Sequence, residues 1–509
     1  MSMPVEHLIR PITLSELLQG FADAPALPVS GIASDSRQLQ RGFLFLACQG
    51  ISSHGTDYLD QAVEAGVAAI AYDATTAQLP TGNVGVPMIA IDNLGRHLGT
   101  IANRFFDSPS AAMQVIGVTG TNGKTTVAWL IAQCKQRLGE ACGYVGTLGS
   151  GIGAIGAGDI EIKEGMTTPA TIELHRQLAE FRDASTASAA VEVSSHALAQ
   201  NRVDGIAFDS VLFTNLSRDH LDYHGDMQSY GDAKARLFVE YGAKQCIINI
   251  DSEFGLRLAE RCGQDVIAVS TNFDRVANGR PYVFVRSVVA NENGSQIRVN
   301  SSWGDGEIAL PLPGDFNVAN AVIVLALLLS QGAPIDKACA VLGDIEAPPG
   351  RMQRVPPVAG RATVYIDYAH TPDALEVALR ALKAHCRGRL WCVFGCGGDR
   401  DTGKRPQMGR IAERHANHVV ITSDNPRGEA PGEIIAAIGG GLQHPEKAKL
   451  LEDREIAIAW AIKEARADDV VLIAGKGHES HQIVGDERRD FSDLAVALET
   501  LAEFSRAKN

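Results

Sequence analysis

The chain has 509 residues, of which 45% are hydrophobic and 21% are charged, a balance typical of globular proteins with sizeable cores. At roughly 150 residues per domain, this length predicts about three domains. The formal net charge of −14 disfavours nucleic acid and anionic membranes as partners. The longest apolar run, residues 321–329, is far shorter than the roughly 20 residues that a membrane-spanning helix needs.

The N-terminus and the cysteines indicate a reducing compartment. Residues 1–18 contain no apolar core followed by a small-residue cleavage site, so we expect no signal peptide. The nine cysteines are scattered, and the closest pair, Cys392 and Cys396, lacks further Cys or His at zinc spacing. We therefore expect buried, reduced thiols in a cytoplasmic protein without membrane insertion.

Two small or polar segments look like joints between domains. They are "FFDSPSAAM" (105–113) and "DIEAPPGRMQRV" (344–355), in which Pro348-Pro349-Gly350 must break any helix. Apolar strands alternate with helix-length segments on both sides of the second joint, which predicts parallel sheets. The first hundred residues also mix strand and helix patterns. We therefore expect an α/β protein with a smaller N-terminal domain (1–112), a central domain (113–348) and a C-terminal domain (349–509).

The clearest motif is "VIGVTGTNGKTTVAWLIAQ" (115–133), in which a strand, a glycine-rich loop and an amphipathic helix follow one another. Loop N–H groups and the helix N-terminus can bind phosphate, Lys124 adds a positive charge, and Thr125 offers a hydroxyl to Mg²⁺. Gly117 and Gly123 are separated by five residues rather than the usual four. A mere turn-forming glycine cluster is the alternative, but the order of strand, loop, Gly-Lys-Thr and helix favours a P-loop.

Acidic and histidine residues follow two further strands of the central region. Glu192 is the only charge in the strand "AAVEV" (189–193), where it is either a solvent-facing residue or a Mg²⁺ ligand at the ligand-binding edge. The loop "TNLSRDHLDYHG" (214–225) carries His220 and His224, for which surface and functional roles are equally open. By its pattern alone, Lys234 in "YGDAKARLF" (230–238) is a solvated helix residue.

Four polar loops in the C-terminal region each follow a predicted strand: "DYAHTPDAL", "GCGGDRDTGKRP", "SDNPRGE" and "GKGHES". Parallel strands place all four loops at one edge of a sheet, where ligands bind. The side chains expected there are His370, Arg400, Asp424, Asn425, Arg427, Lys476, His478 and Glu479. Arginines among acids and amides suit a ligand with both carboxylates and ammonium groups, such as an amino acid.

With "GDFNVAN" (314–320) between them, these motifs resemble those of the Mur ligases over nearly the whole chain. The Mur ligases are ATP-dependent, amide-forming enzymes of peptidoglycan precursor synthesis. The resemblance implies an N-terminal UDP-binding domain, a central P-loop ATPase and a C-terminal Rossmann-like amino-acid domain. It implies no nucleic-acid partner, and we expect a monomer.

The resemblance also implies a role for individual residues. ATP would be bound by Gly120, Thr121, Asn122, Gly123, Lys124, Thr125 and Thr126, with Asn317 and Asn320 near the adenine. The magnesium ions would be held by Thr125, Glu192, His220 and Lys234, the last carbamylated by CO₂. Lys124, Lys234, His220 and Glu192 would be the catalytic residues. The UDP-muramoyl substrate would contact Ser34, Ser36, Ile51, Ser52, Ser53, Thr167, Thr168, Ser194, Gln200 and Arg202. The incoming amino acid would contact Arg400, Asp424, Asn425, Pro426, Arg427, Gly475 and Glu479.

Within the family, "DNPR" (424–427) marks the members that add meso-diaminopimelate rather than L-lysine. Because the two amino acids differ by one distal carboxylate, Arg427 can grip the first and would repel the ammonium of the second. The implied reaction joins meso-diaminopimelate to the D-Glu γ-carboxylate of UDP-N-acetylmuramoyl-L-Ala-D-Glu through an acyl phosphate.

Three alternatives to this function fit the sequence less well. An L-lysine-adding member is disfavoured by Arg427, and folylpolyglutamate synthase lacks both the UDP domain and "DNPR". A regulatory protein without catalysis would be expected to lack Lys124, Glu192, His220 or Lys234, and all four are present.

Overall fold

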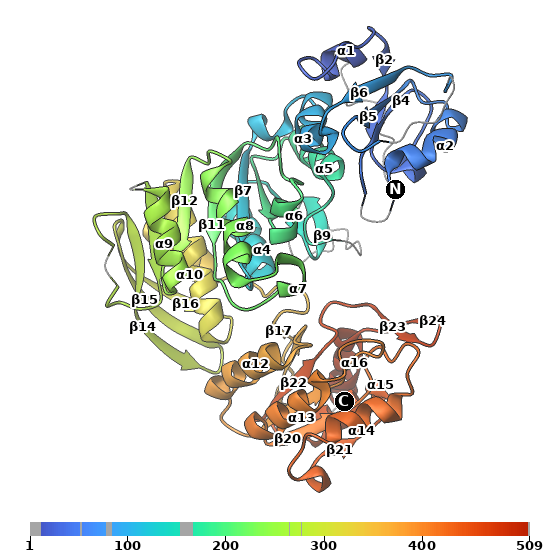
Figure 1. The fold of residues 1–509 in the computed structure, drawn as a ribbon. Helices are drawn as coiled ribbons and strands as arrows, with labels where there is room; N and C mark the ends of the chain where they lie inside the picture. The colour runs from blue at the N-terminus through green and yellow to red at the C-terminus, as the bar shows by residue number, and fades with distance from the viewer. Residues whose placement is uncertain are drawn as a thin grey trace. The chain divides into compact units, whose positions relative to one another are not determined.

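The structure, a computed structural model of the chain, describes residues 12–50, 53–77, 84–152, 166–263, 265–275 and 277–506. It forms two compact units: the first contains the chain up to Ala268 with residues 277–281, and the second contains the rest (Figure 1). The boundary falls within β13 (Val266–Ser270), so residues 282–348 lie in the second unit. None of the helices in the described ranges is both long and apolar enough to span a membrane.

The N-terminal domain is a four-stranded parallel sheet, in the order β3-β4-β5-β6, with helices on both faces. Leu44 and Leu46 of β4 pack in a core with α1 and α3, whereas Phe45 and Ala47 pack in a second core with α2. This alternation is what a strand buried on both faces requires. The elements are β1 (Ile12–Thr13), α1 (Leu14–Leu17), β2 (Pro28–Val29), β3 (Gly31–Ala33), η1 (Ser36–Gln38), β4 (Phe43–Ala47), η2 (Gly55–Tyr58), α2 (Leu59–Glu64), β5 (Ala69–Asp73), β6 (Met88–Ile91), α3 (Leu94–Phe105) and η3 (Pro109–Ala112).

The central domain contains the strands predicted from the sequence. β12, β11, β7, β10 and β8 are neighbours in that order and all parallel, and β9 adds an antiparallel strand. The loops that follow β7, β10 and β11 therefore leave the same edge of the sheet. The elements are β7 (Gln114–Thr119), α4 (Lys124–Arg137), β8 (Cys142–Gly146), β9 (Gly149–Ile152), α5 (Thr171–Asp183), β10 (Ser188–Glu192), α6 (Ser195–Ala199), β11 (Phe208–Phe213), α7 (Leu221–His224), α8 (Met227–Val239), β12 (Gln245–Asn249) and α9 (Glu253–Cys262).

Helix α4 differs from the amphipathic helix that the sequence predicts. Every residue from Thr125 to Lys135 is buried, because the helix packs against β7, β8 and β10 in the middle of the domain. Lys135, on this buried stretch, forms an ion pair with Glu140 at 2.7 Å. The glycine-rich loop is thus attached to a helix that is enclosed on all sides.

The second unit begins with three antiparallel strands and two helices. These are β14 (Tyr282–Asn291), β15 (Gly294–Ser301), β16 (Gly304–Leu310), α10 (Asp315–Ser330) and α11 (Ile335–Leu342). Helix α10 packs against β14, and α11 packs against β16. The predicted break at Pro348-Pro349-Gly350 lies between α11 and β17, outside any helix.

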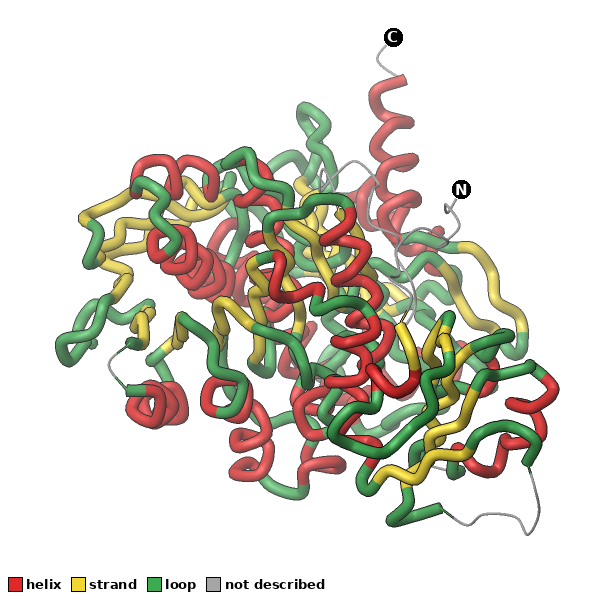
Figure 2. The backbone as a smooth tube through the Cα atoms, turned by 90° about the horizontal axis from the view of Figure 1, so that it is seen from above, coloured by secondary structure: helices red, strands yellow, loops and turns green. Residues whose placement is uncertain are grey.

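The C-terminal domain is a sheet in the order β17-β18-β22-β19-β20-β21, parallel except for β17, with helices on both faces. Helices α12, α13 and α14 share one apolar core with it, and α15 and α16 share the other. Helix α16 is the last element before the C-terminus (Figure 2). The elements are β17 (Gln353–Arg354), β18 (Thr363–Asp367), α12 (Pro372–His385), β19 (Leu390–Phe394), α13 (Lys404–His415), β20 (His418–Ile421), α14 (Pro431–Gly439), η4 (Pro445–Lys447), β21 (Lys449–Leu450), α15 (Arg454–Glu464), β22 (Val470–Ala474), β23 (His481–Val484), β24 (Glu487–Asp490) and α16 (Asp493–Arg506).

Candidate active site

The glycine-rich loop between β7 and α4 is fixed by residues at the end of β11. Gly120 has a φ of +149°, and an added Cβ would lie 1.9 Å from Thr214 Oγ1, so only glycine fits there. The Asn215 carbonyl accepts from Thr121 N–H at 2.9 Å, and Asn215 Oδ1 accepts from Asn122 N–H at 3.0 Å. The sequence showed Asn215 only as part of a polar loop. In the structure its two oxygens hold the backbone of the phosphate-loop candidate.

Helix α4 begins directly after this loop and has no side-chain cap. Its N-cap residue, Gly123, has a φ of +87°. Uncapped N–H groups at a helix N-terminus are suited to phosphate oxygens. Lys124 Nζ donates to the carbonyl oxygens of Gly120 at 3.0 Å and Thr121 at 2.9 Å, so its charge lies over the loop. Thr126 is buried in the same first turn.

Glu192, at the carboxyl end of β10, is completely buried. Thr125 Oγ1 donates to its Oε2 at 2.9 Å, while the Tyr144 hydroxyl at 2.6 Å and the Thr147 N–H at 2.9 Å donate to its Oε1. Burial excludes the solvent-facing alternative, and the three donors fix the carboxylate next to the start of α4. Tyr144 and Thr147 were not predicted, because nothing in their local sequence distinguishes them.

The Thr125 hydroxyl and the Glu192 carboxylate are oxygen donors of the kind that Mg²⁺ takes. Within the described part of the chain, no three His, Cys, Asp or Glu side chains gather into a metal site. Magnesium commonly uses one or two protein carboxylates and takes its remaining ligands from phosphates and water. The pair therefore fits a magnesium ion bound together with a nucleotide.

Lys234 is not the solvated residue that its helical pattern suggested. On α8 its side chain is only 1% exposed, and its Nζ donates to the Gly120 carbonyl at 2.8 Å and lies 4.5 Å from the centre of the Tyr230 ring. Burial, assisted by the charge of Lys124, lowers the pKa of Lys234 well below its usual value. The helical pattern did not predict this burial, because α8 packs beside the glycine-rich loop and the burial of a single lysine leaves no periodic signal in the sequence.

The histidines predicted after β11 form a ring cluster with a third. His220 has a φ of +52° and a half-exposed side chain, and its ring centre lies 4.8 Å from that of His196. His224 is 5.4 Å from His196 between ring centres and is hydrogen-bonded to Ser195 Oγ at 3.0 Å. Burial lowers the pKa of both His196 and His224. His196 belongs to the "SSH" motif but was not singled out from the sequence.

A cavity of about 660 Å³ lies within the first unit, between residues of the N-terminal and central domains. Ser34 lines one part of it, together with the rings of Phe43 and Phe105. Another part is lined by Gly146, where an added Cβ would lie 2.1 Å from Glu192 Oε1. The cavity therefore extends from the N-terminal domain to the immediate surroundings of the buried carboxylate.

Several residues assigned to the muramoyl substrate lie around Glu192. Thr168 Oγ1 donates to the Glu192 carbonyl at 2.8 Å and accepts from Ser194 N–H at 3.0 Å. Arg202 donates to the Thr168 carbonyl at 3.1 Å and to Gln200 Oε1. These side chains thus form one network.

The remaining substrate assignments in this unit are less connected. Thr167 Oγ1 accepts from Thr147 Oγ1 at 3.2 Å, next to the Glu192 network. Ser36 begins η1 and Ser53 Oγ accepts from Tyr58, but neither lines the cavity. Ile51 and Ser52 lie outside the described residues. Asn317 and Asn320 are buried on α10 in the second unit, and their role at adenine stays a prediction.

In the C-terminal domain the predicted rim assembles at the carboxyl ends of β20 and β22. Lys476 is fully buried, and its Nζ donates to Asn425 Oδ1 at 3.1 Å and to Glu479 Oε2 at 3.0 Å. Asn425 Nδ2 donates to the same carboxylate oxygen at 2.9 Å. Asp424 is also buried, and its Oδ1 lies 3.7 Å from Lys476 Nζ. This oxygen has no hydrogen-bond partner in the described residues. Gly475, with a φ of +119°, passes close to Asp424 Oδ2.

Arg427 has a φ of +51°, unusual for a residue with a side chain. Its N–H donates to the Ile483 carbonyl at 3.1 Å, and its own carbonyl accepts from Gly485 N–H at 2.7 Å. Its Nη1 donates to the Gly398 carbonyl at 2.9 Å. Pro426 before it is buried, and Arg400 on the neighbouring loop is exposed. Hairpin β23–β24, which fixes Arg427, was not predicted.

Together the fold and these residues define a class: a three-domain P-loop protein with an acidic oxygen site beside the loop and, in its C-terminal domain, a rim of acidic, basic and amide side chains. Family models agree with this description. The Mur ligase family catalytic domain matches residues 28–106, the Mur ligase middle domain matches 118–328, and the Mur ligase glutamate ligase domain matches 350–477.

Known proteins resemble the chain over most of its length. It is 43% identical over 93% of its residues to UDP-N-acetylmuramoyl-L-alanyl-D-glutamate–2,6-diaminopimelate ligase of Coxiella burnetii (strain RSA 493 / Nine Mile phase I), of which it covers 96%. It is 42% identical over 92% of its residues to the ligase of the same name from Haemophilus influenzae (strain PittEE), of which it covers 95%. A solved structure titled as that ligase superposes with a TM-score of 0.73 at 30% identity and covers 97% of this chain and 100% of its own. The chain therefore belongs to the Mur ligase family.

Proposed function

We propose that the protein is the ATP-dependent ligase that adds meso-diaminopimelate to the D-Glu γ-carboxylate of UDP-N-acetylmuramoyl-L-Ala-D-Glu in peptidoglycan synthesis. The observation that carries the proposal is the cavity that runs from the N-terminal domain to Gly146 beside Glu192. A long substrate bound in this cavity would have its reactive end beside Glu192. Neither a lysine-adding ligase nor a folylpolyglutamate synthase is favoured by the relatives.

ATP would be held by residues 120–126 on the uncapped N-terminus of α4, with Asn317 and Asn320 at the adenine. Mg²⁺ would be held by Thr125 and Glu192, assisted by His220, and would neutralise charge on the phosphate oxygens when bound. Lys124, poised over the loop, supplies a second positive charge to the transferred group.

Lys234 would carry a carbamate. Only the neutral amine reacts with CO₂, and burial beside Lys124 lowers the pKa of Lys234 and so favours that form. Carbamylation replaces a buried cation by an anion with two oxygen donors, next to Gly120 and the positive charge of Lys124. That anion would complete the acidic oxygen site for magnesium.

The reaction would proceed in two steps. The D-Glu γ-carboxylate attacks the γ-phosphate of ATP, and the bond to ADP breaks, leaving an acyl phosphate. The neutral amine of diaminopimelate then attacks the acyl carbon, the amide bond forms as the nitrogen releases one proton, and phosphate leaves with the electron pair of the broken C–O bond. Ser34, Ser36 and residues 51–53 would bind the uridine end, and Thr167, Thr168, Ser194, Gln200 and Arg202 the muramoyl dipeptide.

The rim of the C-terminal domain would bind diaminopimelate. Glu479 and Asp424 can accept hydrogen bonds from its ammonium groups, and Arg427 with Arg400 can bind its distal carboxylate. Gly475, Asn425 and Pro426 would shape the site. We further propose that the domains meet near residues 112 and 348 and that the protein is a monomer. It would act in the cytoplasm and contribute to cell shape and cell division.

Mass spectrometry of the reaction products tests the function. The purified chain with ATP, Mg²⁺, UDP-N-acetylmuramoyl-L-Ala-D-Glu and meso-diaminopimelate should yield the UDP-linked tripeptide and ADP in equal amounts. Hydrolysis of ATP without a new amide product would contradict the proposal. A Lys124→Ala variant provides the inactive control.

A further inference from the structure

The loops after β19 and β20 are joined by an ion pair between Arg405 and Glu429. Arg405 lies in the first turn of α13 and is only 4% exposed. Its Nη1 donates to Glu429 Oε2 and its Nη2 to Glu429 Oε1, both at 2.8 Å. This bidentate geometry fixes both the distance and the plane of the pair, and it compensates the buried guanidinium charge.

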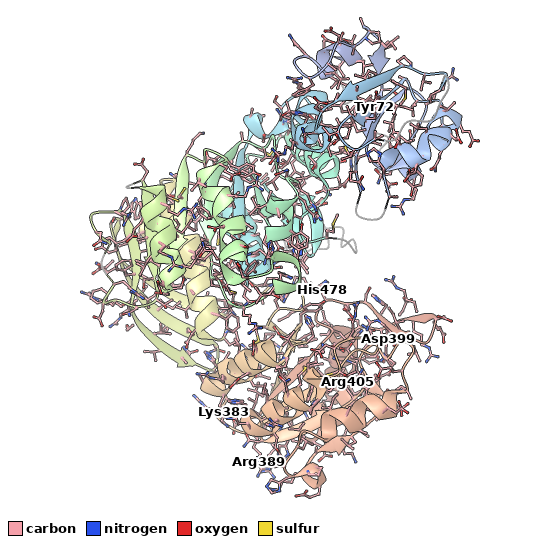
Figure 3. All side chains as sticks on the ribbon, viewed as in Figure 1. Tyr72, Lys383, Arg389, Asp399, Arg405 and His478 are labelled. Carbon is pink, nitrogen blue, oxygen red and sulfur yellow. The ribbon has the colours of Figure 1, made fainter. Side chains whose placement is uncertain are left out.

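The pair also holds the backbone of the loop after β19. Arg405 Nη2 donates to the Gly397 carbonyl at 3.3 Å, and Glu429 Oε1 accepts from Asp399 N–H at 2.6 Å. Asp399 Oδ2 in turn accepts from Gly428 N–H at 3.0 Å. Asp399 and Arg405 are labelled in Figure 3 in the C-terminal domain. Residues 397–399 are therefore clamped against residues 428–429.

Gly398, at the centre of the clamped segment, is the residue that orients Arg427. Its N–H donates to the Asn425 carbonyl at 2.9 Å, and its carbonyl accepts from Arg427 Nη1 at 2.9 Å. An added Cβ on Gly398 would lie 1.8 Å from the Pro426 carbonyl, so the two loops are in close contact. In the described residues, only Nη1 of the Arg427 guanidinium has hydrogen-bond partners, which leaves Nε and Nη2 to form a fork for a carboxylate.

We propose that Arg405 and Glu429 are positioning residues for amino-acid specificity. They set the Gly398 carbonyl and, through it, the direction in which the Arg427 guanidinium presents its remaining N–H groups. The inference rests on the proposed function, in which Arg427 binds the distal carboxylate of meso-diaminopimelate. The charges of Arg405 and Glu429 satisfy each other, so the pair acts through Arg427 rather than on the ligand.

The test compares kcat/KM for meso-diaminopimelate and for L-lysine in the full chain and in two variants, Arg405→Lys and Glu429→Gln. Lysine at 405 cannot form the bidentate pair, and glutamine at 429 removes its charge while nearly keeping its shape. Because misplacement of a binding group by about 1 Å can cost about 100-fold, we expect kcat/KM for diaminopimelate to fall about 10- to 100-fold. The low value for lysine should not fall, because lysine has no distal carboxylate for the Arg427 fork to bind, and the KM for ATP should stay within about 2-fold of the wild type.

A matched control is Asp469→Asn in the same domain. Asp469 accepts from the Trp391 indole at 3.0 Å and from Arg389 N–H at 2.8 Å at the amino end of β22, at the edge opposite the loops. The Asp469→Asn substitution should lower the melting temperature without altering the ratio of kcat/KM for diaminopimelate to kcat/KM for lysine. Equal losses for both amino acids in Arg405→Lys and Glu429→Gln would overturn the positioning role.

A double-mutant cycle with Arg427→Ala separates the inference from the function on which it rests. In the Arg427→Ala background, Arg405→Lys should change discrimination no further. If Arg427→Ala itself leaves discrimination unchanged, both the role of Arg427 and the positioning role fail. If Arg427→Ala abolishes discrimination and Arg405→Lys and Glu429→Gln preserve it, only the positioning role fails.

Discussion

Two lysine ammonium groups share one carbonyl oxygen beside the phosphate-loop candidate. Lys124 Nζ lies 3.0 Å and Lys234 Nζ 2.8 Å from the oxygen of Gly120. Two positive charges this close repel each other, and burial adds a desolvation cost that falls mainly on Lys234. Loss of the proton from Lys234 would remove this repulsion, and the proposed carbamate on Lys234 would replace it by an attraction to Lys124.

The carbamate can be tested directly. After incubation with ¹³C-bicarbonate, the wild-type chain should give a carbamate resonance in ¹³C NMR that is absent from Lys234→Met. The variant should also lose at least about 100-fold in kcat, because an electrostatic group at the reacting phosphate is removed. Lys244→Met is a suitable control, since Lys244 is exposed and, among the residues that the structure describes, pairs with Asp209 alone. A fully active Lys234→Met would contradict the role.

The sequence predicted which strands end at the site, but not which single side chains are enclosed there. The strands ending at Thr119 and Glu192 were visible as apolar runs followed by polar loops, because burial of a whole strand leaves a continuous pattern. Lys234, Tyr144 and Asn215 left no such pattern. Their roles depend on how α8, β8 and β11 meet, which is a property of tertiary packing.

At the scale of elements, the glycine-rich loop depends on close contact between the end of β7 and the end of β11. Gly120→Ala should therefore lower both ATP affinity and thermal stability, because its Cβ would lie 1.9 Å from Thr214 Oγ1. Gly139→Ala is the matched control: Gly139 also has a positive φ, +87°, but no atom lies within 4 Å of an added Cβ. The control should cost only about 1 kcal/mol of stability and leave ATP binding intact. Equal ATP affinity in the two variants, measured by calorimetry, would refute this account of the loop.

The clamp between the loops after β19 and β20 has a pH signature. The hydrogen bonds from Arg405 lower the pKa of Glu429 from 4.5 to about 2. A carboxyl group whose pKa is lower in the folded state stabilises the fold above its unfolded pKa, and this contribution is lost as the pH falls through the folded pKa. The wild type should therefore lose more stability than Glu429→Gln between pH 4.5 and about pH 2. Denaturant titrations give the free energy of unfolding of both proteins across this pH range. Parallel pH profiles for the wild type and Glu429→Gln would mean that the ion pair contributes nothing to stability.

The elements of the C-terminal domain could be predicted from the sequence only in part. The four loops at one edge of the C-terminal sheet were predicted, because parallel strands place their carboxyl ends together. The hairpin β23 and β24 was missed, since residues 481–490 are mostly polar and intermediate or exposed, without the alternation that predicts a strand. Its register matters, because Ile483 and Gly485 hold the backbone of Arg427.

In the molecule as a whole, the first unit contains the proposed substrate cavity and the phosphate-loop candidate, and the second unit contains the rim proposed to bind the amino acid. In the proposed reaction the amino acid consumes the acyl phosphate formed from ATP and the dipeptide, so continued turnover of ATP should require both the UDP-linked dipeptide and the amino acid. Because the net charge of −14 repels anionic ligands, these must be bound by local positive groups such as Lys124 and Arg427.

The most direct measurement is phosphate release from ATP with UDP-N-acetylmuramoyl-L-Ala-D-Glu and Mg²⁺, comparing meso-diaminopimelate with L-lysine in the wild type and in Arg427→Lys. We expect fast turnover with diaminopimelate, at most residual turnover with lysine, and loss of the diaminopimelate activity in the variant. A lysine retains the positive charge but not the planar fork, so this substitution isolates bidentate recognition. Equal turnover of the two amino acids by the wild type would contradict the assignment of diaminopimelate as the substrate that this enzyme selects.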